Sequence, residues 1–353
     1  MKITVAQSDL SHALRAVARA VGNGRSHAIL AGVLLQATDG KLHVTAYDLD
    51  LGISTTIAAA VDTAGATVVP HRLLADITGR LDGSEALSLA VDGARVTLTA
   101  SSGSYSLSVA SADDFPALPV VNAAAGAPVD LSGALAAVMP AVATDASKLL
   151  LTGIHLRSAG GALHIEAADG HRLATRTIAA DLPDLDVVVP ARTLQQVRQP
   201  ATITVESRQV AIALVDGTSI ISSTLEGAYP NVQALIPDAF KHSLTVNRLA
   251  LLHALERVAV IADSHNSVVK LEVSNGSLKV GAEAEANSGS ELIACDGKLP
   301  TIAANVHYLI DGIKGISGDT LDIKANAATT PVVITSATDA DSLYLVMPVQ
   351  IRS

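Results

Sequence analysis

The sequence contains no tryptophan, two phenylalanines and five tyrosines, although 49% of its 353 residues are hydrophobic. Its core must therefore be filled by alanine, valine, leucine and isoleucine, which favours close-packed sheets and helices and argues against an aromatic ligand pocket. The one cysteine, Cys295, excludes an intrachain disulfide, and without Cys or His nearby at ligand spacing it also argues against structural zinc. We expect neither a cofactor nor a metal.

Long apolar runs and excess positive charge are absent as well. The first residues, MKITVAQSDL, have no signal-peptide core, and no run approaches the roughly 20 residues of a membrane span. We therefore expect a soluble cytoplasmic protein with no membrane partner. The net charge is −10, and the thirds divided at residues 120 and 240 carry −3, −4 and −3. This even acidity argues against a general nucleic-acid binder, because phosphate affinity comes from Lys and Arg.

The sequence does contain one pattern three times. Each copy begins with a short strand, a Ser, Asp or Asn suited to a helix N-cap, and an apolar helix, in residues 3–22, 127–145 and 242–263. A strand pair joined by a glycine turn follows, and then a second short helix and further strands. The turns are Asp39-Gly40, Gly160-Gly161 and Asn275-Gly276.

The repeats predict an α+β chain of three domains, 1–120, 127–240 and 241–353, each with two helices packed on antiparallel sheets. Proline-bounded stretches at 113–128 and 227–240 are predicted linkers. Enzymes seldom need three equivalent copies of a fold in a row. The repetition therefore favours a scaffold that surrounds or spans a partner.

Positive charge is concentrated in the predicted helices. These hold nine basic and five acidic residues, a net charge of +4, which leaves −14 for the remainder. In the first helix a buried stripe places Arg15 and Arg19 on another face. If the helices lie on one side of a sheet layer, their basic residues form a positive surface that can bind phosphates. The alternative is that these helix faces are charged only because they are exposed to solvent. The helix windows are 8–22, 71–81, 130–143, 191–199, 246–262 and 305–315.

Three short motifs then stand in order: DGHRLA at 169–174, EGAYPNVQALIP at 226–237 and YLVMPV at 344–349. With the three repeats they resemble the β subunit of bacterial DNA polymerase III, the sliding clamp, over the whole chain. The resemblance implies a homodimeric ring of six clamp domains that encircles double-stranded DNA without sequence preference. It implies a non-enzymatic processivity factor whose partners are the polymerase III catalytic subunit, the clamp loader and other proteins with clamp-binding motifs.

The resemblance also implies a groove between the second and third domains that accepts these peptide motifs. The leucines and Met347 would provide an adaptable apolar floor, Gly170 would let backbone approach, and His171 and Arg172 would donate hydrogen bonds. The matching positions are Leu151, Ala168, Gly170, His171, Arg172, Leu173, Pro230, Leu235, Leu345, Val346 and Met347.

DNA contact is implied for Arg25, and Lys148 is a candidate because Leu149 and Leu150 stand where some clamps have DNA-contacting tyrosines. Ala168 replaces a threonine common in the pocket, and Gln350 stands where arginine is usual, so a specialised second clamp copy stays open. The helix arginines predicted to face DNA are Arg72, Arg80, Arg192, Arg198 and Arg248.

Two other hypotheses compete with a clamp. By residue type, Asp169 with His171, or Asp48 with Asp50, could form acid–base or metal pairs. The sequence has no G-x-S-x-G, P-loop or H-E-x-x-H motif to support them. The other alternative is an interaction scaffold that never meets DNA, in which the helix arginines only solubilise the protein.

Overall fold

The computed structural model describes residues 1–25, 27–121, 128–263, 266–284 and 287–350. The predicted start of the second domain, residue 127, and the predicted end of the third, residue 353, lie outside them. Within the described chain, no helix combines the length and the apolar character that crossing a membrane requires.

The backbone forms two compact units. The first comprises Met1–Asp130 and Gln196–Thr224, and the second comprises Leu131–Gln195 and Leu225–Ser353. The middle repeat is thus divided between them. Its strands within 153–190 join the sheet of the third repeat, and its strands within 201–223 join a sheet of the first. The bounds of the three predicted domains stay a prediction.

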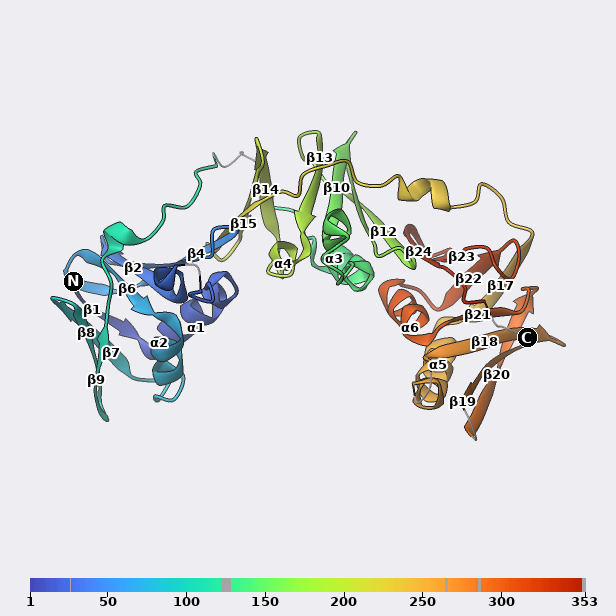
Figure 1. The fold of residues 1–353 in the computed structure, drawn as a ribbon, viewed down its shortest axis with the longest axis horizontal. Helices are drawn as coiled ribbons and strands as arrows, with labels where there is room; N and C mark the ends of the chain where they lie inside the picture. Colours follow the sequence, from blue (N-terminus) through green and yellow to red (C-terminus); the bar gives the residue numbers. More distant parts are fainter. Residues whose placement is uncertain (26, 122–127, 264–265, 285–286, 351–353) are drawn as a thin grey trace. The chain divides into compact units, whose positions relative to one another are not determined.

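The first unit contains two antiparallel sheets, with α1 (Gln7–Val17) packed on β3 and β4 and α2 (His71–Thr78) against α1 (Figure 1). Of the predicted stripe, Leu10, Ala13, Leu14 and Val17 are buried as expected, whereas Val21 lies beyond the end of α1 and is half-buried. The seven-stranded sheet has the order β14 (Ala201–Glu206), β15 (Gln209–Leu214), β16 (Ser219–Ser223), β4 (Leu51–Ala58), β3 (Lys41–Tyr47), β2 (Gly32–Thr38), β6 (Gly65–Pro70). The five-stranded sheet has the order β5 (Ala60–Thr63), β1 (Lys2–Ala6), β7 (Ala86–Asp92), β8 (Arg95–Ala100), β9 (Gly103–Ser108).

The second unit is built on one antiparallel sheet of twelve strands. Helix α3 packs on β11 and β12, α5 packs on β18, β19 and β20, and α6 contacts α3, α5 and β24. The strand order is β13 (Leu185–Pro190), β10 (Gly153–Ala159), β11 (Ala162–Ala168), β12 (Arg172–Ala179), β24 (Asp339–Val346), β23 (Val332–Ser336), β22 (Thr320–Ala325), β17 (His242–Asn247), β20 (Asn287–Gly297), β19 (Ser277–Ala284), β18 (Val268–Ser274), β21 (Ile302–Asn305). The helices are α3 (Ser132–Val138), α4 (Ala191–Leu194), α5 (Arg248–Ala262) and α6 (Val306–Gly315).

Helix lengths and caps differ from the prediction in the first two repeats. The window 191–199 holds only the four residues of α4, which ends at Leu194 and is followed by irregular backbone up to β14. The predicted N-cap is confirmed in the third repeat, where Asn247 accepts the backbone N–H of Ala250, but α1 and α3 begin without a side-chain cap hydrogen bond. Asn305 caps α6 in the same way, which was not predicted. Short 3₁₀ segments are η1 (Ala18–Ala20), η2 (Ala28–Ala31), η3 (Ala112–Asp114), η4 (Met139–Ala141), η5 (Leu149–Thr152) and η6 (Val232–Leu235).

The three predicted hairpin turns are confirmed. Both residues of Asp39-Gly40, Gly160-Gly161 and Asn275-Gly276 have positive φ. This left-handed backbone matches the twist of the strands that each turn joins, β2 to β3, β10 to β11 and β18 to β19.

Candidate functional site

The stretch 169–172 of the second unit is a turn closed by its own aspartate. Asp169 Oδ1 accepts hydrogen bonds from the backbone N–H groups of His171, at 2.8 Å, and Arg172, at 3.1 Å. Gly170 has φ +93°, and Lys148 Nζ donates to the carbonyl oxygen of Asp169 at 2.8 Å. The Asp169 carboxylate therefore holds the turn and makes no hydrogen bond to the His171 ring, which argues against the acid–base pair considered from the sequence.

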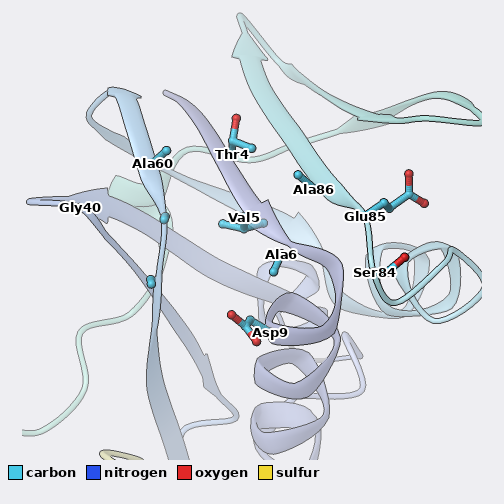
Figure 2. A pocket seen from close by; sticks show the side chains of 11 residues that line it. Thr4, Val5, Ala6, Asp9, Gly40, Ala60, Ser84, Glu85 and Ala86 are labelled. Carbon is cyan, nitrogen blue, oxygen red and sulfur yellow. The ribbon is translucent and has the colours of Figure 1, made fainter.

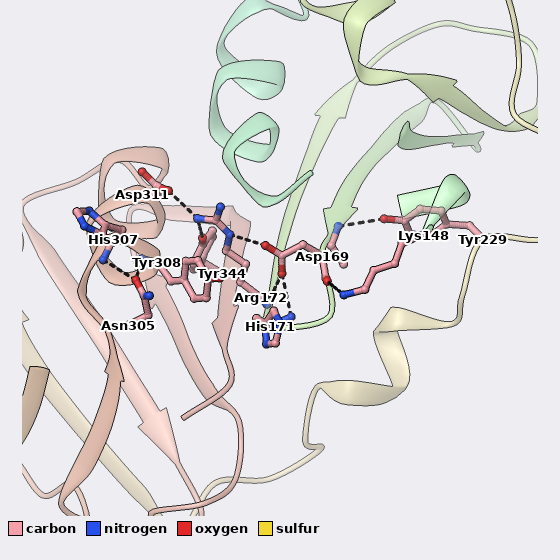
Figure 3. Close-up of polar contacts among 11 residues, drawn as sticks. Lys148, Asp169, His171, Arg172, Tyr229, Asn305, His307, Tyr308, Asp311 and Tyr344 are labelled. Atoms are coloured by element: carbon pink, nitrogen blue, oxygen red, sulfur yellow. Dashed lines mark hydrogen bonds and ion pairs between the residues drawn. The ribbon is translucent and has the colours of Figure 1, made fainter. Parts of the chain in front are cut away.

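Arg172 joins this turn to the third repeat, as Figure 3 shows. Its Nε donates to Asp169 Oδ2 at 3.0 Å, and its Nη1 donates to Asp311 Oδ2 at 2.6 Å and to the Tyr344 hydroxyl at 3.4 Å. The guanidinium carbon lies 4.3 Å from the centre of the Tyr308 ring. Burial alone would lower the pKa of Arg172, but Tyr344, Asp311 and Asp169 raise it. The predicted donor to a peptide is thus already engaged within the chain.

Beside the turn lies a set of apolar side chains that we call the Leu173 cluster. Leu173 of β12 stands opposite Leu345 of β24, and Met347 N donates to the carbonyl of His171 at 2.8 Å. The sequence-predicted Ala168, Leu173, Leu345 and Met347 are therefore brought together. The buried members are Ala168, Leu173, Val232, Val333 and Leu345, and the partly buried members packed on them are Tyr229, Ile236, Phe240, Leu343 and Met347.

The remaining predicted peptide-site residues surround this cluster. Leu235 ends η6 with 48% of its surface exposed, and Pro230 is exposed beside Tyr229. Val346 is buried opposite Arg172, and half-buried Leu151 lies in η5. Their joint use by a peptide stays a prediction.

The sequence prediction missed Tyr229, Val232 and Ile236, although Val232, Leu235 and Ile236 follow the i, i+3, i+4 spacing of an apolar face. It also missed Tyr308 and Asp311 of α6. These two are three residues apart on a helix, so they share a face, but no local signal in the sequence directs that face toward Arg172.

The predicted DNA-facing residues differ in availability. Arg72 of α2 and Arg80, two residues beyond its end, are exposed and lie 3.9 Å and 3.7 Å from the Asp76 carboxylate. Arg80 Nη1 also donates to the Asp76 carbonyl at 2.7 Å. Lys148 is bound to the Asp169 carbonyl, and Arg248 Nε donates to the Gly318 carbonyl at 2.6 Å. A phosphate would have to replace these last two bonds. Arg25, Arg192 and Arg198 are also exposed.

Other acidic groups form neither a metal site nor a convincing ligand site. Asp48 Oδ1 accepts from the backbone N–H groups of Asp50 and Leu51, so it too closes a turn. Across the described residues, no three His, Cys, Asp or Glu side chains are grouped as metal ligands. A hollow of about 390 Å³ in the first unit has Asp9 and Glu85 among its lining residues (Figure 2). Glu85 is already bound to the Ser101 N–H and hydroxyl.

Three models of the DNA polymerase III beta subunit match in order, the N-terminal domain over residues 1–119, the central domain over 128–231 and the C-terminal domain over 233–350. The chain belongs to the DNA polymerase III beta subunit family. The expected fold class, three clamp domains of helices on antiparallel sheets, is confirmed.

Members named beta sliding clamp resemble the chain over its full length. That of Synechococcus elongatus is 36% identical over 375 residues, covering 100% of both chains, and that of Synechocystis sp. is 35% identical, covering 99% of this chain and 100% of its own. The Bacillus subtilis DNA polymerase sliding clamp has a TM-score of 0.93 at 24% identity, covering 100% of both chains. The Bartonella birtlesii clamp bound to griselimycin has a TM-score of 0.91 at 26% identity, covering 99% of this chain and 100% of its own.

Proposed function

We propose that this sliding clamp closes as a homodimeric ring around double-stranded DNA and tethers a DNA polymerase and other replication proteins, without catalysing a reaction itself. The observation that carries the proposal is the match of all three clamp-domain models in order over the whole chain. The excess of basic over acidic residues in the predicted helix windows supports it, because a ring needs positive charge only where it faces phosphates. We place this activity in the cytoplasm.

The decisive experiment is retention on DNA. The protein is loaded on a circular plasmid with a clamp loader and ATP, and the plasmid is then cut once. A ring held by encirclement slides off the linear product, whereas an ordinary electrostatic binder ignores the cut and responds to salt. Retention that survives the cut, or no loading at all, would contradict the proposal and favour the specialised copy or the non-DNA scaffold.

Two sheet edges support the homodimer. In the described chain, β20 residues 287–294 pair with β19 on one side, and β17 takes only residues 295–297 on the other. Strand β9 ends the five-stranded sheet of the first unit. We propose that β9 of one copy meets β20 of the other, since open edges invite pairing. Two hydrophobic side chains are exposed here. Leu292 of β20 exposes 72% of its surface, and Val260 of α5, which packs on β20, exposes 76%.

The interface is tested by a double variant, Val260→Asp with Leu292→Asp. Two charges in an apolar contact should shift the protein from dimer to monomer in light scattering coupled to gel filtration. Val215→Asp, at another exposed valine, is the matched control and should stay dimeric. A double variant that remains dimeric would place the interface elsewhere.

We further propose that peptides bind over the Leu173 cluster, with Leu235 and Met347 as the outer apolar contacts. Leu235→Ala or Met347→Ala should weaken a fluorescent clamp-binding peptide by about 1 kcal/mol or more. Leu173 is fully buried, so its truncation would also damage the fold and is a poorer test. Leu249→Ala, an exposed leucine of α5, is the control. Unchanged affinity in both variants would refute the site.

The DNA-facing assignment is tested with Arg25→Ala and Arg72→Ala, whose side chains are exposed. Each should shorten retention on the circular plasmid at raised salt and leave peptide affinity unchanged. Lys148→Ala should affect the turn at Asp169 as well, because its ammonium is bound there. Equal retention in the arginine variants would remove these residues from the DNA-facing set.

A further inference from the structure

The loop of residues 226–237, which we call the Tyr229 loop, carries Pro230 and Leu235 of the proposed peptide surface. Its regular structure is limited to η6. Side-chain hydrogen bonds hold the loop against β11. The Tyr229 hydroxyl accepts a hydrogen bond from Ala168 N at 3.0 Å, and Gln233 Nε2 donates to Glu166 Oε2 at 2.8 Å. The position of the loop therefore depends on the groups that hold Tyr229 and Glu166.

His155 of β10 holds both of these groups. Its ring stacks on the Tyr229 ring, with centroids 4.9 Å apart and planes 25° from parallel. Its Nδ1 lies 2.7 Å from Glu166 Oε1, and its Nε2 lies 2.8 Å from Asp186 Oδ1. A neutral imidazole has one N–H and one lone pair, and a carboxylate only accepts. Both contacts are hydrogen bonds only when the ring carries two protons, so the geometry requires the imidazolium.

The surrounding charges favour the same state. Glu166 from β11 stands directly opposite His155, Asp186 comes from β13 on the other side, and Arg157 of β10 acts on Glu166. Burial opposes protonation, but the hydrogen bonds to Glu166 and Asp186 outweigh it and raise the pKa of His155. Burial would likewise raise the pKa of Glu166, whereas His155 and Gln233 lower it. One cation is thus held between two carboxylates.

We propose that protonated His155 is a positioning residue for peptide binding: it fixes Tyr229 directly and Gln233 through Glu166, and so sets the place of Pro230 and Leu235. This inference rests on the proposed function of that surface. Deprotonation leaves a lone pair facing a carboxylate and removes the attraction of a cation to the Tyr229 ring. The Tyr229 loop then loosens, and the peptide binds less tightly.

The raised pKa of His155 sets where on the pH scale the effect appears. Below the ordinary histidine value of about 6.5 the ring is protonated, so its contribution to the position of the loop is complete. It is lost as the pH rises through the raised pKa of His155. Peptide affinity should therefore fall, by about fivefold, as the pH rises from below about 6.5 through the raised pKa.

The test measures the affinity of the full-length protein for a fluorescent clamp-binding peptide and for griselimycin from pH 6 to pH 9 at constant ionic strength. His155→Gln should bind weakly at every pH. His155→Arg keeps a planar cation that can donate to two carboxylates, so it should bind tightly with a flat profile. His164→Gln is the matched control, since His164 lies on β11 with its ring bound to Thr177, and it should keep the wild-type slope.

Hydrogen exchange of residues 226–237 gives a readout without a ligand. Protection, corrected for the intrinsic rate, should fall with rising pH in the wild type and be low throughout in His155→Gln. Tight binding of the probes with a flat wild-type profile and constant protection would overturn the inference and leave the proposed function standing. Failure of the wild type to bind either probe at any pH would overturn both.

Discussion

The chain contains the same strand junction twice, once in each unit, and the two differ in charge. In the first unit β4 pairs with β16, with Leu51 opposite Ser222, and in the second β12 pairs with β24, with Arg172 opposite Val346. Each junction follows an aspartate-capped turn, at Asp48 and Asp169, whose Oδ1 accepts two backbone N–H groups. The backbone plan is therefore shared.

The side chains across the junctions are not shared. In the first, Leu51 is buried in the core and the Thr55 and Thr218 hydroxyls lie 3.3 Å apart. In the second, the corresponding positions are Arg172, bound to Asp311, and Arg176, bound to Asp339. These positions carry neutral side chains in the first junction and arginines in partly buried ion pairs in the second.

The space beside the strands also differs. Gly52 of the first junction has no side chain, and an added Cβ would lie 2.9 Å from the Leu118 side chain. Leu173 takes the corresponding position in the second junction and packs on Val232, while Leu235 nearby stays exposed. The shared backbone thus carries neutral side chains at the compared positions of the first junction. At the second it carries arginine ion pairs beside a partly exposed apolar surface.

Of the substitutions that test this difference between the junctions, Arg172→Ala should cause the largest loss of local stability. Arg172→Ala leaves Asp169 and Asp311 without their cation, so we expect a loss of about 3 kcal/mol in the local stability of β12 and β24. Hydrogen exchange should report faster exchange there and no change at β4 and β16. Leu51→Ala should show the reverse pattern through a core cavity.

A second change separates charge from packing at the same place. Adding Asp311→Asn to Arg172→Ala removes one unpaired carboxylate and should recover part of the lost protection. A double variant as unstable as the sum of its single changes would mean that Arg172 acts by packing alone.

Replacing Asp339 should cause the next largest loss of stability in the second junction. It is buried and accepts hydrogen bonds from Ser317 N, Ser342 Oγ and the Arg176 guanidinium. Burial raises its pKa, but these bonds outweigh burial and lower it. Its stabilisation is therefore complete above the unfolded value of about 3.9 and is lost as the pH falls through the lowered pKa.

Asp339→Asn should cost about 2 kcal/mol at neutral pH and make the second unit less sensitive to acid. Hydrogen exchange of β24 from pH 7 to pH 3 measures this. Thr55→Val in the neutral junction should not alter the acid response of β4. Equal acid sensitivity of wild type and Asp339→Asn would contradict the assignment.

Local features of the fold were predictable because they depend on short sequence patterns. The Asn275-Gly276 turn is dictated by residues that tolerate positive φ, and the buried stripe of α1 by its period. The resemblance carried by the motifs at 169–174, 226–237 and 344–349 predicted one site for Ala168, Leu173, Leu345 and Met347, and these four lie together.

The junctions themselves could not be predicted from such patterns. Pairing of β4 with β16 joins residues more than 160 positions apart, and nothing local fixes their register. The partner of Arg172 is equally remote, since Asp311 is separated from it by 139 positions. The predicted helix at 191–199 is longer than α4, because local helix propensity does not determine where tertiary context ends a helix.

Substitutions in the turns that precede the two junctions should cause the smallest changes in stability. Leu49 has φ +82° and Gly170 has φ +93°, so the same left-handed backbone carries a leucine in one turn and a glycine in the other. Gly170→Ala should destabilise the second turn by about 1 kcal/mol, because a Cβ is strained there and would lie 3.2 Å from Lys148 Nζ. Leu49→Gly relieves the matching strain and should not destabilise the first. Thermal unfolding and local hydrogen exchange measure both, and a loss of similar size in the two variants would mean that backbone strain does not distinguish the turns.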